Sequence, residues 1–330
     1  MTAAPLLSVR DLTVEFHTDA GWLRAIERVS FELMPQEALG IVGESGSGKS
    51  VTALSLLRLH AGSTTRMPSG EIRYDGLDLL TLPARTLRRI RGGEIAMIFQ
   101  DPMSSLNPVL TIADQISETL MLHQGLDRAA ARRQAIASLD RVRIADAARR
   151  VDAYPHQLSG GMRQRVMIAI AIACRPRVLI ADEPTTALDV TIQAQILDLL
   201  RELQGELGMS VILISHDLGV IAEFAQRVLV MYAGRVVEQG PARALYRRPM
   251  HPYTSGLLAA IPPLDADVRR LPTIPGNIPD PSQRIDGCRF SPRCAEVQAA
   301  CRATPPDLVS VGVDHLARCP PRLARLEEAR

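Results

Sequence analysis

The segment Gly43-Glu-Ser-Gly-Ser-Gly-Lys-Ser50 constrains the fold more strongly than any other part of the chain. It fits the G-x-x-x-x-G-K-[ST] pattern, which binds phosphate groups when it connects a buried strand to a helix. This context is present, because the hydrophobic run 38–42 precedes the segment and residues 50–60 carry apolar side chains at helical spacing. The sequence therefore predicts a phosphate loop rather than an incidental glycine-rich turn.

Each residue type of this loop has a physical reason. The glycines let backbone N–H groups converge on phosphate oxygens, and the following helix adds its positive dipole end. Lys49, the only lysine among 38 basic residues, reaches the β- and γ-phosphate oxygens, and Ser50 offers its hydroxyl to Mg²⁺. The candidate nucleotide-binding residues here are Gly43, Glu44, Ser45, Gly46, Ser47, Gly48, Lys49, Ser50 and Val51.

The composition excludes several other classes of protein. The chain has 330 residues, of which 46% are hydrophobic and 22% charged, so it is a folded globular protein rather than a disordered one. A formal net charge of +2 and an aromatic content of 3% argue against nucleic-acid binding. The N-terminus has no secretory signal pattern, and the longest apolar run, 166–174, is too short for a membrane span. We therefore expect the chain to reside in the cytosol.

Hydrophobic periodicity predicts an α/β fold. Alternating apolar residues over 9–16 and 29–33 predict antiparallel strands near the N-terminus. Apolar runs separated by helical stretches indicate a sheet covered by helices. The further expected elements are strands at 38–42, 95–99, 178–181 and 211–214, a helical insert at 110–157 and a late hairpin at 228–237.

The composition changes near residue 248. Thirteen of 23 prolines and four of five cysteines follow this point, which predicts a separate, irregular module. The expected division is therefore a first domain at 1–247, including the insert at 110–157, and a C-terminal extension at 248–330.

Two further motifs accompany the phosphate loop. The run Val178-Leu-Ile-Ala-Asp-Glu183 is a hydrophobic strand ending in two carboxylates, where Asp182 would hold Mg²⁺ and Glu183 would orient or deprotonate the attacking water. An exposed acidic strand end is the alternative. The run Leu158-Ser-Gly-Gly-Met162 starts a helix, with Ser159 as N-cap and with Gly160 and Gly161 permitting close approach of an anion. Since one nucleotide fills the first loop, this second helix start must serve another subunit.

The order GESGSGKS, Gln100, LSGGM, VLIADE, His216 resembles the ATP-binding-cassette (ABC) ATPases over about residues 6–245. The resemblance implies a RecA-like core sheet, an N-terminal antiparallel β-subdomain and a helical subdomain. It also implies two cassettes packed head to tail, with each ATP between one phosphate loop and the partner's Ser159–Gly161 segment.

The same resemblance gives roles to single residues. Gln100 matches the glutamine that touches Mg²⁺ or water, and His216 matches the γ-phosphate histidine. Asp189 belongs to the Ala187–Asp189 loop at the cassette interface. Phe16 is the candidate aromatic for adenine, with the nearby Trp22 and a plain core role for Phe16 as alternatives. The expected catalytic set is Lys49, Gln100, Glu183 and His216, and the Mg²⁺ ligands are Ser50, Gln100 and Asp182.

The extension carries Cys288, Cys294, Cys301 and Cys319 at C-x5-C-x6-C-x17-C spacing. Four thiolates suit one tetrahedral site or one cluster, although this spacing is looser than that of common zinc ribbons and leaves unrelated thiols open. A reducing compartment disfavours disulfides. Cys174 sits apart and is expected to be a small core residue.

The strings Arg248-Pro-Met-His-Pro-Tyr-Thr254 and Gly287–Cys294 resemble the C-terminal extension of oligopeptide and dipeptide ABC importer ATPases. Several members of that group carry a four-cysteine [4Fe-4S] cluster, which the resemblance places on the four cysteines, with Zn²⁺ as the alternative.

The expected function is thus that of an ATPase subunit driving peptide import from the cytoplasmic face of the inner membrane. Its expected partners are a second cassette, two transmembrane permease subunits and an extracytoplasmic substrate-binding protein. The alternatives are an importer for nickel or another small solute, and a soluble ABC ATPase of DNA repair or ribosomes.

Overall fold

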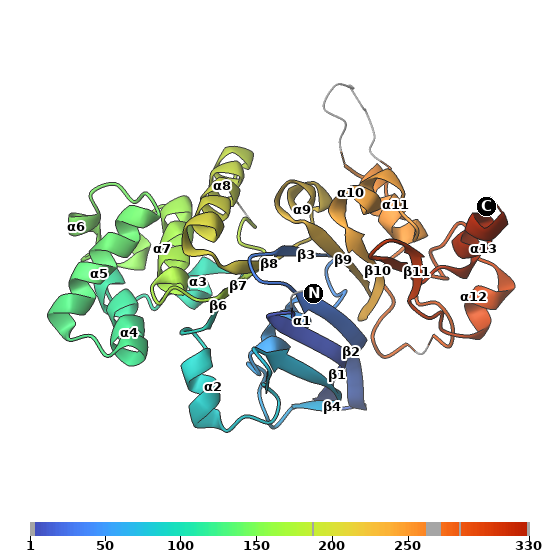
Figure 1. Cartoon of the computed structure of the whole chain (residues 1–330), viewed down its shortest axis with the longest axis horizontal. Coiled ribbons are helices and arrows are strands. Elements are labelled where there is room, and N and C mark those ends of the chain that lie inside the picture. The colour runs from blue at the N-terminus through green and yellow to red at the C-terminus, as the bar shows by residue number, and fades with distance from the viewer. Residues whose placement is uncertain (1–3, 187, 262–271, 284, 329–330) are drawn as a thin grey trace. The chain divides into compact units, whose positions relative to one another are not determined.

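The computed structural model of the chain describes residues 4–186, 188–261, 272–283 and 285–328 (Figure 1). The chain divides into two compact units. The first unit contains the described parts of Met1–Met34, Ala38–Leu80 and Ile214–Arg330, and the second contains Pro35–Glu37 and Thr81–Leu213.

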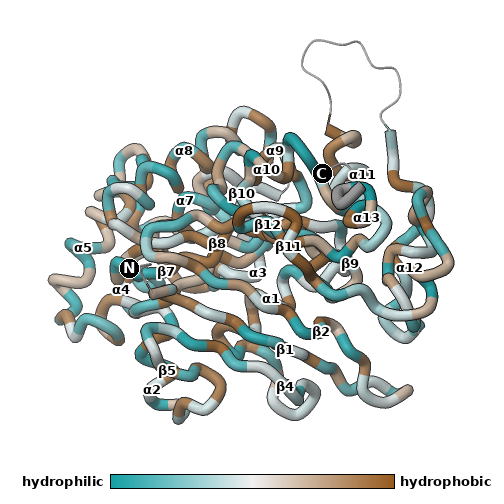
Figure 2. Tube along the Cα trace, turned by 45° about the vertical axis from the view of Figure 1, so that its right-hand side comes forward, coloured by the Kyte–Doolittle hydropathy of each residue, from teal (hydrophilic) through white to brown (hydrophobic). Residues whose placement is uncertain are grey.

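The first unit contains a four-stranded antiparallel sheet near the N-terminus (Figure 1). Its strands, in the order β2-β1-β4-β5, are β2 (Gly21–Leu33), β1 (Leu7–Thr18), β4 (Thr65–Tyr74) and β5 (Leu77–Asp78). Hydrophobic residues recur along β1 and β2 (Figure 2), and the antiparallel register sets several of them opposite one another, which stabilises the pair. Val9 faces Phe31 across the pair, and both are buried. The predicted antiparallel strands are thereby confirmed.

The first unit also contributes five strands of a mixed sheet, in the order β11-β12-β10-β9-β3. These strands are β3 (Ala38–Val42), β9 (Arg227–Tyr232), β10 (Arg235–Pro241), β11 (Val309–Gly312) and β12 (His315–Ala317). β3 runs parallel to β9, and β9 and β10 form the hairpin predicted at 228–237. The helices of this unit are α1 (Lys49–Leu56), α9 (Leu218–Phe224), α10 (Ala242–Arg247), α11 (Pro252–Ala259), α12 (Ala299–Ala303) and α13 (Pro320–Glu328).

Two features of this unit differ from the expectation. The helix predicted over 50–60 ends at Leu56, because Arg58 adopts a left-handed φ of 50° that an α-helix excludes. β12 pairs with β10, so the C-terminal extension shares a sheet and a compact unit with the preceding residues, whereas its composition predicted a separate module. The boundary at 247/248 itself stays a prediction.

The second unit combines parallel strands with the helical insert. β6 (Ile95–Ile98) lies beside β7 (Val178–Asp182), and β8 (Ser210–Ser215), which runs on into the first unit, follows in the order β8-β7-β6. Its helices are α2 (Ala84–Ile90), α3 (Pro102–Ser105), α4 (Ile112–Gln124), α5 (Arg128–Arg141), α6 (Ala147–Arg150), a 3-10 turn at Pro155–Gln157, α7 (Gly160–Ile172) and α8 (Val190–Leu207).

The helical insert expected at 110–157 is confirmed by α4, α5 and α6 (Figure 1). Thr111 and Asp127 cap the first two helices, since each side chain accepts a hydrogen bond from a backbone N–H of the first turn. Gly125 ends α4 in a left-handed conformation. Among the described residues, no helix is both long and apolar enough to span a membrane.

Candidate functional site

The phosphate loop lies between β3 and α1, and its glycines are sterically required. A Cβ on Gly43 would lie 2.2 Å from the Met231 carbonyl oxygen, so only glycine fits beside β9. Gly48 has a φ of 102° and directly precedes α1. In this conformation the loop turns into the helix with its backbone N–H groups at the helix N-terminus. The strand–loop–helix unit predicted from the sequence is confirmed.

Lys49 is buried at the first position of α1, with 5% of its surface exposed. Its Nζ donates hydrogen bonds to the carbonyl oxygens of Gly43 at 2.8 Å and Glu44 at 3.2 Å. Ser47 Oγ is buried, and it has no hydrogen-bond partner among the residues that the structure describes. An ammonium group, a helix N-terminus and the Ser50 hydroxyl beside them are the donor set that a Mg²⁺-bound polyphosphate requires.

Glu44 is fixed from the C-terminal extension. Its backbone N–H donates to Tyr253 Oη at 2.8 Å, and its carboxylate accepts two hydrogen bonds from Arg293, at 2.7 and 3.1 Å. Neither Tyr253 nor Arg293 is a partner of Glu44 that the sequence predicts. In the sequence, the segment that contains Tyr253 indicates only a family resemblance. A buried tyrosine hydroxyl usually has a hydrogen-bond partner, which is the signal that could have pointed to such a contact.

The aromatic candidate Phe16 lies on β1. Its ring packs edge-on against His60, at 5.3 Å between ring centres, and His60 in turn lies within hydrogen-bond distance of Ser55 on α1, at 2.9 Å. Burial lowers the pKa of His60. Trp22 has its ring face covered by the Arg66 guanidinium at 4.2 Å. Phe16 therefore lies near the helix that follows the phosphate loop, and its role toward adenine stays a prediction.

The two predicted carboxylates lie at the end of β7 in the second unit. Asp182 is its last residue and is 4% exposed. Glu183 follows with a φ of 47°, a left-handed conformation that is strained for this residue type and is common at functional sites. Gln100 Nε2 donates to Glu183 Oε2 at 3.1 Å, and Thr186 Oγ1 donates to the same oxygen at 2.8 Å. The structure thus brings together two residues that were singled out separately from the sequence.

The helix start at Ser159 is as predicted. Its hydroxyl accepts a hydrogen bond from the Met162 N–H at 3.3 Å, so Ser159 is the N-cap of α7. Gly160 and Gly161 form the first turn. Ser159 and Gly160 are exposed, whereas a Cβ built on Gly161 would lie 3.2 Å from the Ile192 side chain. The backbone N–H groups at this helix start are therefore approachable by an external group.

The two remaining candidates, Asp189 and His216, lie next to helix starts. Asp189 caps α8 by accepting a hydrogen bond from the Ile192 N–H at 2.8 Å, while Ala187 lies outside the described residues. His216 is exposed in the connection from β8 to α9, next to Asp217, the N-cap of α9. The interface role of Asp189 and the γ-phosphate role of His216 stay predictions.

The four C-terminal cysteines line one small cavity of about 20 Å³ together with Phe290. Burial raises the pKa of the Cys319 thiol to about 11, and it also raises the pKa of Cys288. Among the described residues, no three histidine, cysteine or acidic side chains are placed so that they could hold a metal ion. The expected iron–sulfur cluster therefore has no support in this structure, although the thiols converge. Cys174 lies in the second unit and is half-buried rather than a core residue, and this partial burial raises its pKa to about 11.

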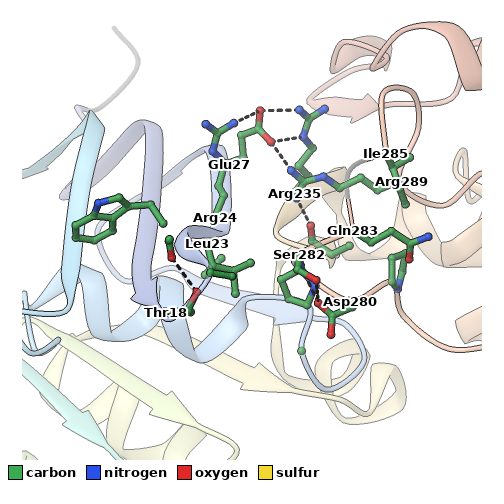
Figure 3. Close-up of a pocket in the computed structure, with 18 of the residues that line it drawn as sticks. Thr18, Leu23, Arg24, Glu27, Arg235, Asp280, Ser282, Gln283, Ile285 and Arg289 are labelled. Carbon is green, nitrogen blue, oxygen red and sulfur yellow. Dashed lines mark hydrogen bonds and ion pairs between the residues drawn. The ribbon is translucent and has the colours of Figure 1, made fainter.

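A larger cavity of about 820 Å³ lies beside Gly46 of the phosphate loop, between the β1–β2 hairpin and residues 279–289 (Figure 3). Glu27 is part of the cavity wall, and its carboxylate forms ion pairs with Arg24, Arg235 and Arg289. Burial raises the pKa of Glu27, but the hydrogen bond from Arg235 and the three positive charges lower it overall. The cavity wall therefore contains an ion-paired cluster, with one carboxylate shared by three arginines, that connects the extension to β2.

Comparisons with known proteins agree with this geometry. Residues 26–186 match the family model described as ABC transporter, and residues 237–301 match the model described as oligopeptide/dipeptide transporter, C-terminal region. A Brucella abortus protein is 62% identical over 98% of this chain and 97% of its own length. The chain belongs to the ABC transporter family. A Brucella melitensis relative is 51% identical over 97% of this chain and 98% of its own length. Both relatives bear the name "Putative peptide import ATP-binding protein".

Solved structures support the same fold. A dimeric ATP-binding cassette in a post-hydrolysis state with ADP and Pi has a TM-score of 0.65 and 28% identity, over 72% of this chain and 99% of its own. A part of an ABC transporter complex from Clostridium perfringens has a TM-score of 0.62 and 27% identity, over 74% of this chain and 92% of its own. The predicted family, the cassette fold and the ATPase activity coupled to transport are thereby confirmed.

Proposed function

We propose that this chain hydrolyses ATP to power the import of di- or oligopeptides through a membrane complex. The observation that supports this proposal most strongly is the match, along nearly the full length of the chain, to relatives named for peptide import. In addition, residues 237–301 match the model for the C-terminal region of oligopeptide and dipeptide transporters. The cassette alone would fit any ABC transporter, so the extension narrows the cargo class.

The phosphate loop binds the β- and γ-phosphates of ATP in this proposal. Lys49 already points back over the loop, and it exchanges the carbonyls of Gly43 and Glu44 for phosphate oxygens. Ser50, Gln100 and Asp182 are the residues that would hold Mg²⁺. The metal ion would neutralise charge that develops on the phosphate oxygens.

Glu183 polarises the attacking water. Its Oε2 accepts hydrogen bonds from Gln100 and Thr186, which orient the carboxylate. A carboxylate held in one orientation can accept a water proton without rearranging, and such positioning supplies much of the rate of phosphoryl transfer. His216 completes the γ-phosphate surroundings, and Phe16 packs against adenine.

Each site needs a second cassette. Ser159, Gly160 and Gly161 begin α7 with approachable N–H groups, and a helix of 13 residues offers the positive end of its dipole to a γ-phosphate. We assign these residues to the ATP held by the phosphate loop of a partner, which is a paralogue or a second copy. Asp189, which caps α8, lies at the interface of the two cassettes in this arrangement.

The second unit also carries the proposed docking surface for the permease subunits. Phe99, Val109 and Leu122 are 42%, 76% and 63% exposed, which leaves large apolar side chains for a membrane partner near β6, α3 and α4. Docking there places the chain peripherally at the cytoplasmic face of the inner membrane, and the permease connects it to a peptide-binding protein on the other side.

We also propose that Cys288, Cys294, Cys301 and Cys319 bind one [4Fe-4S] cluster or one Zn²⁺ that stabilises the extension. Their convergence on one cavity supports this proposal. Because no three of these side chains are placed to hold a metal ion among the described residues, binding requires the thiols to move closer together and to lose their protons. Iron, sulfide and zinc analysis of anaerobically purified protein tests it. About four iron atoms and about four sulfides per chain, or about one zinc ion per chain, lost in Cys294→Ser, support the site, and absence of all three elements contradicts it.

Reconstitution tests the main proposal. The chain is co-expressed with the permease and cassette genes beside its own, purified in detergent and placed in vesicles with the matching binding protein. Peptide-dependent stimulation of ATP hydrolysis and peptide uptake support the proposal. Stimulation by nickel or another small solute without any response to peptides contradicts the cargo assignment, whereas absence of ATP hydrolysis contradicts the whole proposal.

A further inference from the structure

The segment from Cys288 to Cys294 contacts the phosphate loop, although about 240 residues separate the two in sequence. Arg293 gives the direct contact. Its side chain is 5% exposed, and its two Nη atoms donate to the two carboxylate oxygens of Glu44. This two-bond arrangement of guanidinium and carboxylate is the strongest geometry for such a pair.

Arg293 is itself held in one conformation. Its Nε donates to the Pro275 carbonyl at 2.8 Å, and Nη2 donates to the Ile274 carbonyl at 3.2 Å. Burial lowers the pKa of Arg293, but the hydrogen bonds to Glu44 and Tyr232 raise it overall, so the side chain is permanently charged. Little conformational entropy remains to be lost when Arg293 holds Glu44.

Tyr253 makes a second contact with the same residue. It is fully buried, and its hydroxyl accepts the Glu44 N–H. Its ring packs against Tyr232 and Phe290, with centres 4.7 and 5.5 Å away. The backbone of Tyr253 is fixed as well, because its N–H donates to His251 Nδ1 at the start of α11.

A third contact reaches the loop through the β9–β10 turn. Arg289 donates to the Ala233 carbonyl and forms an ion pair with Glu27 (Figure 3). The next residue, Gly234, donates its N–H to the Ser47 carbonyl at 2.9 Å. Arg293, which directly precedes Cys294, therefore holds the loop near its start at Glu44. Arg289, which directly follows Cys288, supports the middle of the loop at Ser47 through the β9–β10 turn.

Glu44 is the point where these contacts meet. Its N–H is held by Tyr253, its carboxylate by Arg293 and its carbonyl by Lys49. Lys49 must leave the carbonyl in order to reach phosphate, whereas the other two contacts stay. Glu44 then keeps its position while the Lys49 ammonium moves to the phosphate. Because the loop is already ordered, nucleotide binding does not cost the conformational entropy of ordering it.

We propose that Arg293 and Tyr253 are positioning residues for nucleotide binding, through which the C-terminal extension preorganises the phosphate loop. The inference rests on the proposed nucleotide site. Neither residue contacts the nucleotide in this scheme; they act through Glu44. The extension is thus a working part of the ATP site, in addition to any role in stabilising the fold.

Nucleotide affinity of the full-length chain tests this inference. We expect Arg293→Gln to weaken Mg-ATP binding roughly tenfold, since a charge-assisted pair contributes at least one factor of ten. Arg293→Lys keeps the charge but loses one of the two parallel bonds, so its affinity should be intermediate. In a double-mutant cycle, Glu44→Gln should add little once Arg293 is changed.

Arg322→Gln is the matched control. Arg322 also pairs with a carboxylate, that of Glu296, and holds Ser255 in the extension, but it makes no described contact with the phosphate loop. Affinity is measured by titration calorimetry, with circular dichroism to verify folding, and kcat and KM are measured on the same samples. We expect KM to rise in Arg293→Gln with kcat nearly unchanged, and neither to change in Arg322→Gln.

The outcomes separate this inference from the proposed function. Wild-type protein that binds no nucleotide contradicts both. Wild-type binding with equal affinity in Arg293→Gln and Arg322→Gln overturns only the positioning role. If Arg293→Gln does not fold, Arg293→Lys and Tyr253→Phe decide, since loss of the Tyr253 hydroxyl removes the acceptor for the Glu44 N–H without removing the ring. Wild-type affinity in both of these variants overturns the inference.

Discussion

His251 lies fully buried at the start of α11, and its ring must stay neutral there. Nδ1 accepts a hydrogen bond from the Tyr253 N–H, which a doubly protonated imidazolium cannot do. Burial lowers the pKa of His251 to about 4, and the Arg322 charge acts in the same direction, while Glu238 and Glu296 oppose it. The same ring is thus essential to the helix that carries the Tyr253 contact with the phosphate loop.

This lowered pKa predicts how stability depends on pH. As pH falls below about 6.5, the unfolded chain binds a proton at His251 that the folded chain does not bind, so the free energy of unfolding decreases. The decrease continues until the folded chain is protonated near pH 4. Each pH unit costs up to about 1.4 kcal/mol, which gives ~3.4 kcal/mol in total and ~1.3 kcal/mol between about pH 7.5 and about pH 5.5.

Urea unfolding followed by circular dichroism at these two pH values measures the effect. His251→Asn should lose ~1.3 kcal/mol less on acidification than the wild type, because an asparagine can cap α11 but does not titrate. His156→Asn, at an exposed position, is the control and should keep the wild-type dependence. Parallel pH dependences in the wild type and His251→Asn would refute the assignment of a buried neutral imidazole.

Three further predictions concern the site and its support. Glu183→Gln should bind ATP with wild-type affinity but lose roughly 10²–10⁴-fold in turnover, as expected for loss of a general base; unchanged steady-state hydrolysis would contradict its role. Gly43→Ala should abolish nucleotide binding, because its Cβ would lie 2.2 Å from the Met231 carbonyl oxygen; retained affinity in calorimetry would show that the loop adapts. Glu27→Gln should lower stability by about 2 kcal/mol in urea unfolding, because three arginines lose their charged acceptor. Glu71→Gln, at an exposed ion pair, should leave the unfolding midpoint unchanged, and equal effects of the two substitutions would contradict the Glu27 cluster.

The sequence was sufficient for those parts of the site whose chemistry is local. The phosphate loop was predicted from one contiguous segment, since the turn, the glycines and the lysine all lie within eight residues. Ser159 was predicted as an N-cap because capping depends on the next three residues only. Glu183 was selected by its position after a hydrophobic strand and Gln100 by its match to the ABC ATPase pattern, and parallel pairing of β6 and β7 brings the two positions together.

The contacts of the extension were beyond sequence reasoning. The pairs formed by Glu44 with Tyr253 and Arg293 span 209 and 249 residues, and no local pattern encodes them. β12 has only three residues, too few for periodicity to indicate a strand. Proline and cysteine content correctly indicated irregular backbone, but composition carries no information on which surface such a segment packs against.

In the proposed mechanism, neither half of the ATP site works until a second cassette supplies the other half. The direct measurement is ATP hydrolysis per chain over a dilution series, with sedimentation of the same samples. We expect the activity per chain to rise with concentration as dimers form, and Glu183→Gln to accumulate as an ATP-bound dimer. Full activity per chain in samples that sediment only as monomers would contradict this requirement for a second cassette.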